Sequence, residues 1–311
     1  MLLKHPPSTS IIDKRKTMRQ IIREAYAKIN LGLDVVGRRE DGYHLVRMIM
    51  QEIGVHDTLT VTAAGVPEGA PLIRLKTDST EIPIGPDNLI CHAAYIMCEA
   101  FDIRDEITID LQKRIPVAAG LAGGSTDAAA VFMALRDLYA PSVTDGQLQE
   151  LALPLGADIP YCIAGGTRLS EGIGEKLIRL PDAPQCCLVL VKPPVAVNTG
   201  MVYRTLDSLA GYPHPDIDGL IDRIAAGDLT GMADKCGNVL ELVTGQLVPV
   251  IGQIEQFFMD RGAVCSKMSG SGPSVFAIYQ EEEKAAQALR EFKETADFSD
   301  CYGALTQFVY R

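Results

Sequence analysis

Polar and apolar residues alternate along much of the first third of the chain. Residues 21–38 read IIREAYAKINLGLDVVGR, and residues 43–56 read YHLVRMIMQEIGVH. The link between them contains Glu-Asp-Gly, and Asp-Gly between two alternating runs is typical of a tight hairpin. The pattern therefore predicts two long antiparallel strands. Further strands are expected at 57–63 (DTLTVTA), 71–77 (PLIRLKT) and 106–115 (EITIDLQKRI).

Helical spacing appears between these strands. The stretch NLICHAAYIMCEAF repeats its apolar residues with a helical period, and we expect Asp87 to cap it. The Ala-rich run 126–139 (TDAAAVFMALRDLY) predicts a second helix. A third follows Thr144, which with Gln147 forms a capping-box pattern.

The second half begins with a buried strand, CCLVLV, and continues with three helical stretches at 198–209, 216–227 and 247–262. It ends with strand, Gly/Ser loop and strand over 263–279, an amphipathic helix at 281–294, and a strand at 302–310. Because the elements are interspersed without strict βαβ alternation, we expect an α+β protein with a seam near residue 180. The predicted domains are 18–181 and 182–311.

Length and composition fit this picture. A chain of 311 residues suits two domains of ordinary size, and no apolar run reaches the ~18 residues that span a bilayer. The first 17 residues lack the apolar core of a secretory signal. We expect them to be a disordered tail, or a mis-annotated start if translation begins at Met18.

Net charge and cysteine content limit the classes of ligand and the cellular compartment that we expect. The net charge of −11 disfavours nucleic-acid binding and means that an anionic ligand needs a local positive site. The eight cysteines form no C-x-x-C pair, so we expect reduced thiols in a cytoplasmic protein. The sequence leaves the oligomeric state open.

A glycine-rich loop, PVAAGLAGGSTDAAA (116–130), joins the predicted strand 106–115 to the Ala-rich helix. A helix N-terminus attracts anions, and Gly120, Gly123 and Gly124 would let the backbone approach a polyphosphate closely. Ser125 and Thr126 add hydroxyl groups. The loop matches neither the G-x-x-x-x-G-K-[ST] nor the G-x-G-x-x-G pattern, so an ordinary tight turn remains the alternative. A second Gly/Ser loop at 266–274 favours a nucleoside triphosphate site.

Three segments together resemble the GHMP kinases, the superfamily of galactokinase, homoserine kinase, mevalonate kinase and phosphomevalonate kinase. They are AYAKINLGLDVVGRREDGYHLV (25–46), PVAAGLAGGSTDAA (116–129) and KMSGSGPSVF (267–276). With LGADIPYCIAGGTRLSEGIGEKL (155–177), the first two resemble the branch whose acceptor is a cytidine diphosphate ester. The resemblance runs from about Ala25 to the last strand. It implies an N-terminal domain like ribosomal protein S5 domain 2 and a ferredoxin-like C-terminal domain.

The resemblance also implies catalytic roles. Lys28 resembles the catalytic lysine, and Asp158 in GADIP resembles the carboxylate that takes or orients the proton of the attacking hydroxyl. Without the motifs, Lys28 reads as an exposed strand lysine and Asp158 as a cap. Asn30 shares a strand face with Lys28 by period two and resembles a residue that orients the substrate.

The resemblance also implies two further sets of contacts, one with the cytosine base of the acceptor and one with the nucleotide. Tyr43 would stack on cytosine, His44 would hydrogen-bond to it, Tyr203 would cover its other face, and Thr199 would contact the same substrate; a core-packed helix residue is the alternative for Tyr203. The resemblance implies ATP and Mg²⁺, with Ser125 as the candidate metal ligand. The residues expected to contact the nucleotide are Asn88, Leu89, Lys113, Pro116, Ala119, Gly120, Leu121, Ala122, Gly123, Gly124, Ser125 and Thr126.

The activity implied is transfer of a phosphoryl group from ATP to the C2 hydroxyl of the cytidine diphosphate ester, a step of non-mevalonate isoprenoid synthesis. Two alternatives remain. The chain could be a homoserine or mevalonate kinase, although DGYH and Tyr203 favour a substrate that carries a base. It could instead be a sensor that has lost catalysis, although Lys28 and Asp158 are both present. One departure from the family pattern is Asp127, which would place negative charge near a polyphosphate.

Overall fold

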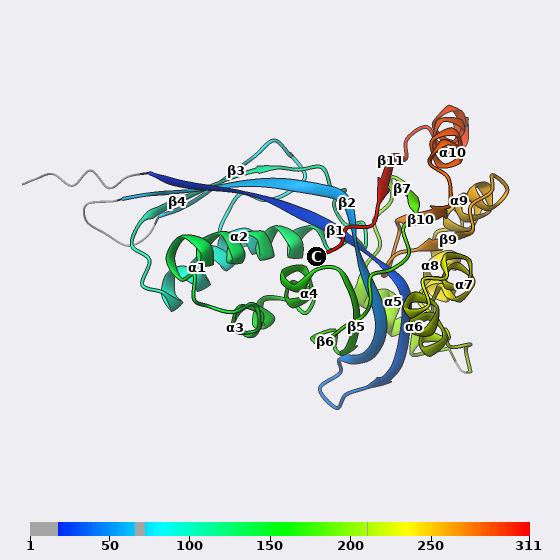
Figure 1. Cartoon of the computed structure of the whole chain (residues 1–311), viewed down its shortest axis with the longest axis horizontal. Helices are drawn as coiled ribbons and strands as arrows, with labels where there is room; N and C mark the ends of the chain where they lie inside the picture. Colours follow the sequence, from blue (N-terminus) through cyan, green and yellow to red (C-terminus); the bar gives the residue numbers. More distant parts are fainter. Residues whose placement is uncertain (1–17, 66–71, 210) are drawn as a thin grey trace, which may run out of the picture.

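The computed structural model describes residues 18–65, 72–209 and 211–311, so the predictions for residues 1–17 lie outside the described residues. Figure 1 shows an elongated molecule with a long sheet at one end and a smaller sheet at the other. The strands are β1 Arg19–Arg38, β2 His44–Ala64, β3 Ile73–Thr77, β4 Glu106–Gln112, β5 Thr167–Gly172, β6 Lys176–Arg179, β7 Cys187–Lys192, β8 Gly237–Asn238, β9 Cys265–Met268, β10 Val275–Tyr279 and β11 Tyr302–Gln307. The helices are α1 Leu89–Ala100, α2 Gly123–Tyr139, α3 Asp145–Ala152, α4 Ile159–Ala164, α5 Thr199–Leu206, α6 Ile217–Ala225, α7 Leu229–Lys235, α8 Glu241–Leu247, α9 Val250–Met259 and α10 Glu282–Glu294.

The first sheet is built on the predicted hairpin. β1 and β2 are 20 and 21 residues long and pair in antiparallel register from Arg38↔His44 to Arg19↔Ala63. The strand order is β3-β4-β2-β1-β8, with β5 on the far end of β2 and β6 on β5. The two strands predicted at 43–56 and 57–63 are therefore one, because the ladder continues past the register shift between Tyr26 and Ala27.

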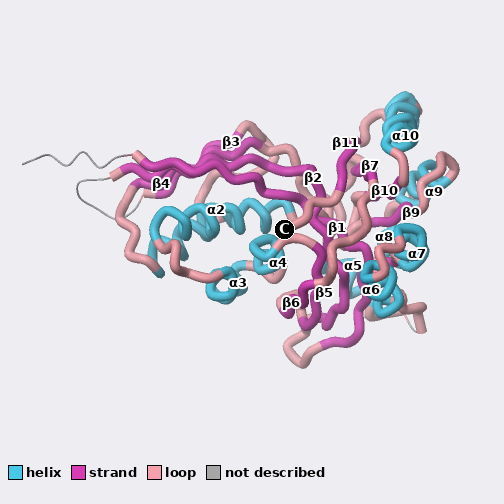
Figure 2. The backbone as a smooth tube through the Cα atoms, viewed as in Figure 1, coloured by secondary structure: helices cyan, strands magenta, loops and turns pink. Residues whose placement is uncertain are grey.

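Helices α1 to α4 lie together against one face of this sheet (Figures 1 and 2). The small side chains of α2 permit close packing, and residues 126–135 of this helix are all buried. The capping box of Thr144 and Gln147 is confirmed at α3. The predicted cap at Asp87 is wrong by one residue, because the Asn88 side chain accepts the hydrogen bond from the Ile90 amide at 2.9 Å.

The second sheet has the order β11-β7-β10-β9, and all its pairs are antiparallel. Helices α9 and α10 pack on it through a cluster of phenylalanine rings. The ring centroids of Phe292 and Phe298 are 4.6 Å apart, and Phe257 meets both edge-on. The α+β class with two lobes is confirmed. The sequence patterns missed the short helices α4, α7 and α8, which are too brief to show a helical period.

The two lobes exchange short segments across the expected seam. β8 leaves the second lobe and pairs in parallel with β1 at Gly32↔Gly237, and Phe308 bridges to Ile53 of β2. The division at residues 181 and 182 stays a prediction. No helix within the described part of the chain is long and apolar enough to cross a membrane.

The lobes also touch through their two glycine loops. Gly120 has a φ of +74°, and a Cβ on it would overlap the carbonyl oxygen of Ser269 in the 269–272 turn. The Ser269 hydroxyl donates to the Gly120 carbonyl at 3.1 Å. A Cβ on Gly270 would in turn stand 3.0 Å from that carbonyl. Glycine is required at position 120 by this backbone contact and by its left-handed conformation.

We expect Gly120→Ala to destabilise the protein by about 2 kcal/mol or more, because it adds left-handed strain to a backbone clash. Urea denaturation would measure the loss. The control is Gly252→Ala in α9, where an added Cβ meets nothing within 4 Å and where alanine favours the helix by up to about 1 kcal/mol. Equal stability of the Gly120 variant and the wild type would show that the loops separate easily.

A buried ion pair fixes residues 308–311 to the first lobe. The Glu52 carboxylate is 1% exposed, lies 3.0 Å from Arg311 Nη2 and accepts a hydrogen bond from the Gly166 amide at 2.9 Å. Gly166 follows α4, so this contact supports the segment that carries GADIP. Burial raises the pKa of Glu52, although Arg311 opposes the shift.

We expect Arg311→Met to lower the free energy of unfolding by about 2 kcal/mol at pH 8, because it leaves the Glu52 carboxylate buried without its cation. A raised pKa means that the folded state binds the proton more tightly, so stability falls as the pH rises through the interval between the unfolded and folded pKa of Glu52. Losing Arg311 extends that interval upward, and the loss should therefore be smaller at pH 5. Denaturation at both pH values tests this, with Arg311→Lys as the control. A loss that does not change with pH would contradict it.

Candidate active site

A cavity of about 700 Å³ opens between the two lobes, a size that suits a small-molecule ligand. β1, β2, the glycine loop, α5, the 269–272 turn and the residues just before α4 all contribute to its wall. It brings together all seven residues that the sequence assigned to catalysis and substrate binding: Lys28, Asn30, Tyr43, His44, Asp158, Thr199 and Tyr203.

Lys28 and Asn30 stand on one face of β1, as their spacing predicts. The Lys28 ammonium donates to Asn30 Oδ1 at 2.8 Å, and both residues are almost fully buried. The Lys28 amide donates to the Leu121 carbonyl at 3.1 Å, which ties β1 to the glycine loop. A buried cation is costly unless its donors are satisfied, so this ammonium is placed to meet an anionic group in the cavity.

Asp158 stands at the N-cap position of α4, yet its side chain caps no amide there. It is half-buried and lines the same cavity as Lys28. The cap alternative is therefore wrong, because the carboxylate makes no capping bond. Burial raises the pKa of the nearby Tyr203 phenol, and the charge of Asp158 raises it further, so this hydroxyl stays neutral.

The N-terminus of α2 faces the cavity without a side-chain cap. Its N-cap residue, Ala122, is in the left-handed region with φ +57°, as is Ala118 with φ +51°. Helices α1, α3 and α5 each carry a capping side chain at this position. The first amides of α2 are thus left for a ligand, and with the helix dipole they favour an anion.

A second cavity of about 300 Å³ lies on the other side of this loop. Asn88, Leu89 and Lys113 line it. The glycine-loop residues that do so include Pro116, Ala119, Gly120, Leu121, Ala122, Gly123, Gly124 and Ser125, so eleven of the twelve residues expected to contact the nucleotide meet here. Gly120, Ala122 and Ser125 line both cavities. The two cavities therefore meet at the uncapped end of α2.

Thr126 is the exception. Its side chain is buried and bonds to the Cys162 thiol, which turns it away from both cavities. Of the two hydroxyl groups that the loop sequence offered, only that of Ser125 faces a cavity. The sequence could not separate them, because adjacent helix residues point in different directions and only packing decides which is inside.

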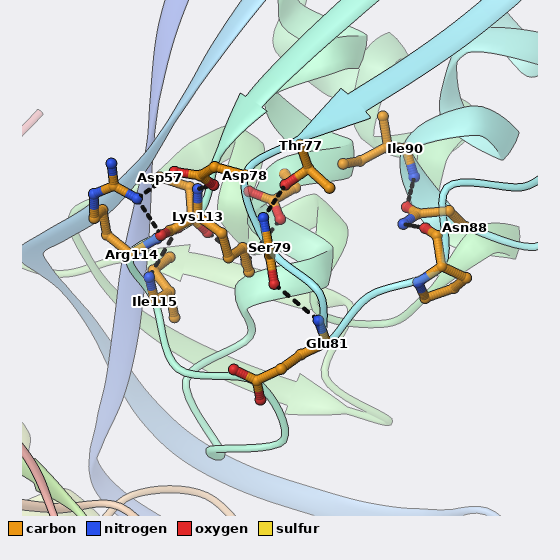
Figure 3. Close-up of polar contacts among 12 residues, drawn as sticks. Asp57, Thr77, Asp78, Ser79, Glu81, Asn88, Ile90, Lys113, Arg114 and Ile115 are labelled. Atoms are coloured by element: carbon orange, nitrogen blue, oxygen red, sulfur yellow. Dashed lines mark hydrogen bonds and ion pairs between the residues drawn. The ribbon is translucent and has the colours of Figure 1, made fainter.

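Lys113 is held beneath the loop between two buried carboxylates. Its ammonium lies 2.5 Å from Asp57 Oδ2 and 2.9 Å from Asp127 Oδ2. Asp57 also accepts from the amides of Arg114 and Ile115 (Figure 3). Burial raises the pKa of Asp127, and its neighbour Asp57 adds to the shift while Lys113 opposes it. Asp127 is 2% exposed and also lines the second cavity, where its carboxylate is paired with Lys113.

Aromatic rings and charged groups surround the opposite end of the larger cavity. Tyr43 is 61% exposed at the hairpin tip, while the rings of His44 and Tyr203 stack with centroids 4.7 Å apart. His44 Nε2 lies 2.8 Å from Asp207 Oδ1, and Arg38 donates to Asp207 Oδ2 at 3.2 Å.

Two groups in this site carry no signal in the sequence. Asp207 follows α5 and meets His44 only through the fold, across 163 residues of chain. Ser271 bonds the Thr199 hydroxyl at 2.7 Å and lines the cavity, although the sequence marked only its loop.

Known proteins share this architecture. Residues 88–166 match the family model described as GHMP kinases N terminal domain, and residues 209–297 match GHMP kinases C terminal. The chain is 44% identical to 4-diphosphocytidyl-2-C-methyl-D-erythritol kinase of Lachnospira eligens over 92% of this chain and 98% of that protein. It is 44% identical to the protein of the same name from Acetivibrio thermocellus, over 89% and 96% of the two chains.

Solved structures agree. A crystal structure of 4-(cytidine 5'-diphospho)-2C-methyl-D-erythritol kinase superposes with a TM-score of 0.76 at 30% identity, covering 93% of this chain and all of that one. The mevalonate kinase of L. major shares the fold with a TM-score of 0.72 at 15% identity, over 94% and 97% of the two chains. The chain belongs to the GHMP kinases and, within them, to the family of 4-diphosphocytidyl-2-C-methyl-D-erythritol kinases.

Proposed function

We propose that this protein transfers the γ-phosphoryl group of ATP to the C2 hydroxyl of 4-diphosphocytidyl-2-C-methyl-D-erythritol, giving the 2-phosphate and ADP. The observation that carries the proposal is the junction of the two cavities at Gly120, Ala122 and Ser125. A phosphoryl group bound at this junction would contact the nucleotide on one side and the acceptor alcohol on the other. Lys28 and Asp158 line the acceptor side.

The acceptor alcohol is activated by the groups around it. The Asp158 carboxylate takes or orients the proton of the C2 hydroxyl as the oxygen attacks phosphorus. The Lys28 ammonium, oriented by Asn30, stabilises the negative charge that develops on that oxygen and on the transferred group. Most of the rate enhancement in phosphoryl transfer comes from such positioning and charge stabilisation.

The phosphate chain is bound by backbone rather than by a loop lysine. The free amides at the start of α2 and the helix dipole supply fixed positive charge at the junction. Lys113 contributes indirectly, because its ion pairs with Asp57 and Asp127 connect the strand before the loop to the helix after it.

Mg²⁺ fits this donor set as a companion of the nucleotide. Among the described residues, no group of three or more His, Cys, Asp or Glu side chains could hold a metal ion, and Mg²⁺ in kinases takes few protein ligands beside phosphates and water. The Ser125 hydroxyl, which faces both cavities, is the residue that would hold it. When bound, the ion neutralises phosphate charge.

At the far end of the larger cavity, Tyr43 and Tyr203 would enclose the cytosine ring, and His44 would hydrogen-bond to its edge. Thr199, fixed by Ser271, would contact the same substrate. Each of these groups lines the cavity that holds Lys28 and Asp158. The substrate is therefore a small molecule that carries a base at one end and an alcohol at the other.

An ADP-release assay with three acceptors tests the reaction. We expect turnover with 4-diphosphocytidyl-2-C-methyl-D-erythritol and rates at least about 100-fold lower with homoserine and mevalonate, because these acceptors leave the aromatic end of the cavity unfilled. Comparable rates with either of the two smaller acceptors would contradict the assignment.

Asp158→Asn should lower kcat by about 100-fold or more, since the amide cannot accept the hydroxyl proton. The KM for ATP should stay within about twofold of the wild-type value, because the carboxylate lines only the acceptor cavity. Asp182→Asn, at an exposed carboxylate outside both cavities, is the control and should leave the kinetics unchanged. A wild-type kcat for the Asp158 variant would remove this carboxylate from the mechanism.

A further inference from the structure

Asp207 links the two lobes at the base end of the larger cavity. It is the C-cap residue of α5, and its carboxylate reaches back to the hairpin of the first lobe. Oδ1 lies 2.8 Å from His44 Nε2 at the start of β2, and Oδ2 accepts from Arg38 Nη1 at 3.2 Å at the end of β1. The His44 side chain is only 13% exposed, so this contact is a defined one.

The contact decides which nitrogen of His44 carries the hydrogen. An ionised carboxylate can only accept, so Nε2 must be the donor. In the neutral imidazole this leaves Nδ1 as an acceptor. Nδ1 has no hydrogen-bond partner within residues 18–65, 72–209 and 211–311. The Tyr203 ring, stacked on His44 at 4.7 Å, prevents the imidazole from turning freely.

We propose that Asp207 is a positioning residue that makes the base site selective for cytosine over uracil by fixing the His44 tautomer. The inference rests on the proposed function, in which His44 hydrogen-bonds to the base. The Asp207 carboxylate bonds to His44 and Arg38, and it acts on the base through His44.

The two pyrimidines differ at the position that such an acceptor can distinguish. Cytosine carries an amino group at C4, which donates a hydrogen bond, whereas uracil carries a carbonyl oxygen, which only accepts. An accepting Nδ1 that faces C4 pairs with the amino group and opposes the carbonyl. A site whose buried polar group is left unpaired rejects a ligand strongly, so one fixed hydrogen is enough to separate the two bases.

Calorimetric titration of the intact protein with CDP and UDP at pH 8 tests the proposal. The wild type should prefer CDP by about tenfold or more. In Asp207→Asn the side-chain amide can donate to Nε2 as well as accept from it, so His44 can carry its hydrogen on either nitrogen. We expect the preference for CDP over UDP to fall to about twofold, while ATP affinity stays unchanged.

Two further measurements separate this role from simple destabilisation. The ¹⁵N chemical shifts of the His44 ring should indicate the Nε2-protonated tautomer in the wild type and a mixture in Asp207→Asn.

Asp218→Asn is the matched control, because it removes an equally charged carboxylate that pairs with Arg47 and lies outside the cavity. It should keep the wild-type base preference. Asp207→Ala, which offers Nε2 only water, should also lose the preference.

The outcomes are distinguishable. A wild type that binds neither CDP nor UDP would overturn the proposed function itself. A wild type that prefers CDP, with the same preference and the same ¹⁵N shifts in both Asp207 variants, would overturn the role of Asp207 and leave the proposed function standing.

Discussion

The site depends on a contact between two turns that are almost 150 residues apart in the chain, in which Gly120 meets the backbone of Ser269. Because Gly120 has no side chain at the point of contact, the lobes approach closely enough to share one cavity. The Asn238 side chain fixes the backbone of the second turn, because it donates hydrogen bonds to the Met268 and Gly270 carbonyls. The contact thus sets the position of the α2 N-terminus relative to the groups of the second lobe.

An acidic protein that binds two anionic ligands needs positive charge at the site itself. Here that charge comes from backbone amides at the cavity, while the ion-paired side chains lie beneath the loop. Backbone amides at the start of α2 stand at the junction of the cavities, where a phosphate can reach them. Beneath the loop, the Lys113 ammonium pairs with the carboxylates of both Asp57 and Asp127. Dipoles fixed by the fold cost little reorganisation when the substrate arrives, which is the condition for effective electrostatic catalysis.

The base end of the larger cavity is built from both lobes. The hairpin of the first lobe supplies His44, and the second lobe supplies Tyr203 in α5 and Asp207 at its C-cap. β8 and residues 308–311 cross between the lobes at other places, and Arg311 supports the segment after α4 through Glu52. The lobes therefore act as one unit at the site, although each has its own sheet.

The sequence by itself determined the elements and the chemistry. Period-two alternation predicted the β1–β2 hairpin, and helical spacing predicted α2 and α10. The motifs pointed to a set of site residues, and all of them except Thr126 line at least one of the two cavities. These features are local, because they follow from the residue types within a few positions of one another. The sequence pattern did not predict very short helices such as α4 and α7, since one or two turns are too few to show a helical period.

Only the tertiary structure decided how side chains pair over long distances. It buried Thr126 against Cys162, placed Lys113 between two carboxylates, made Gly120 a contact point between loops, and brought Asp207 to His44. None of these follows from the sequence, because the partners lie from 14 to 163 residues apart in the chain and are brought together by strand register and packing. Local patterns define which groups are available, whereas the approach of the two lobes defines which of them meet.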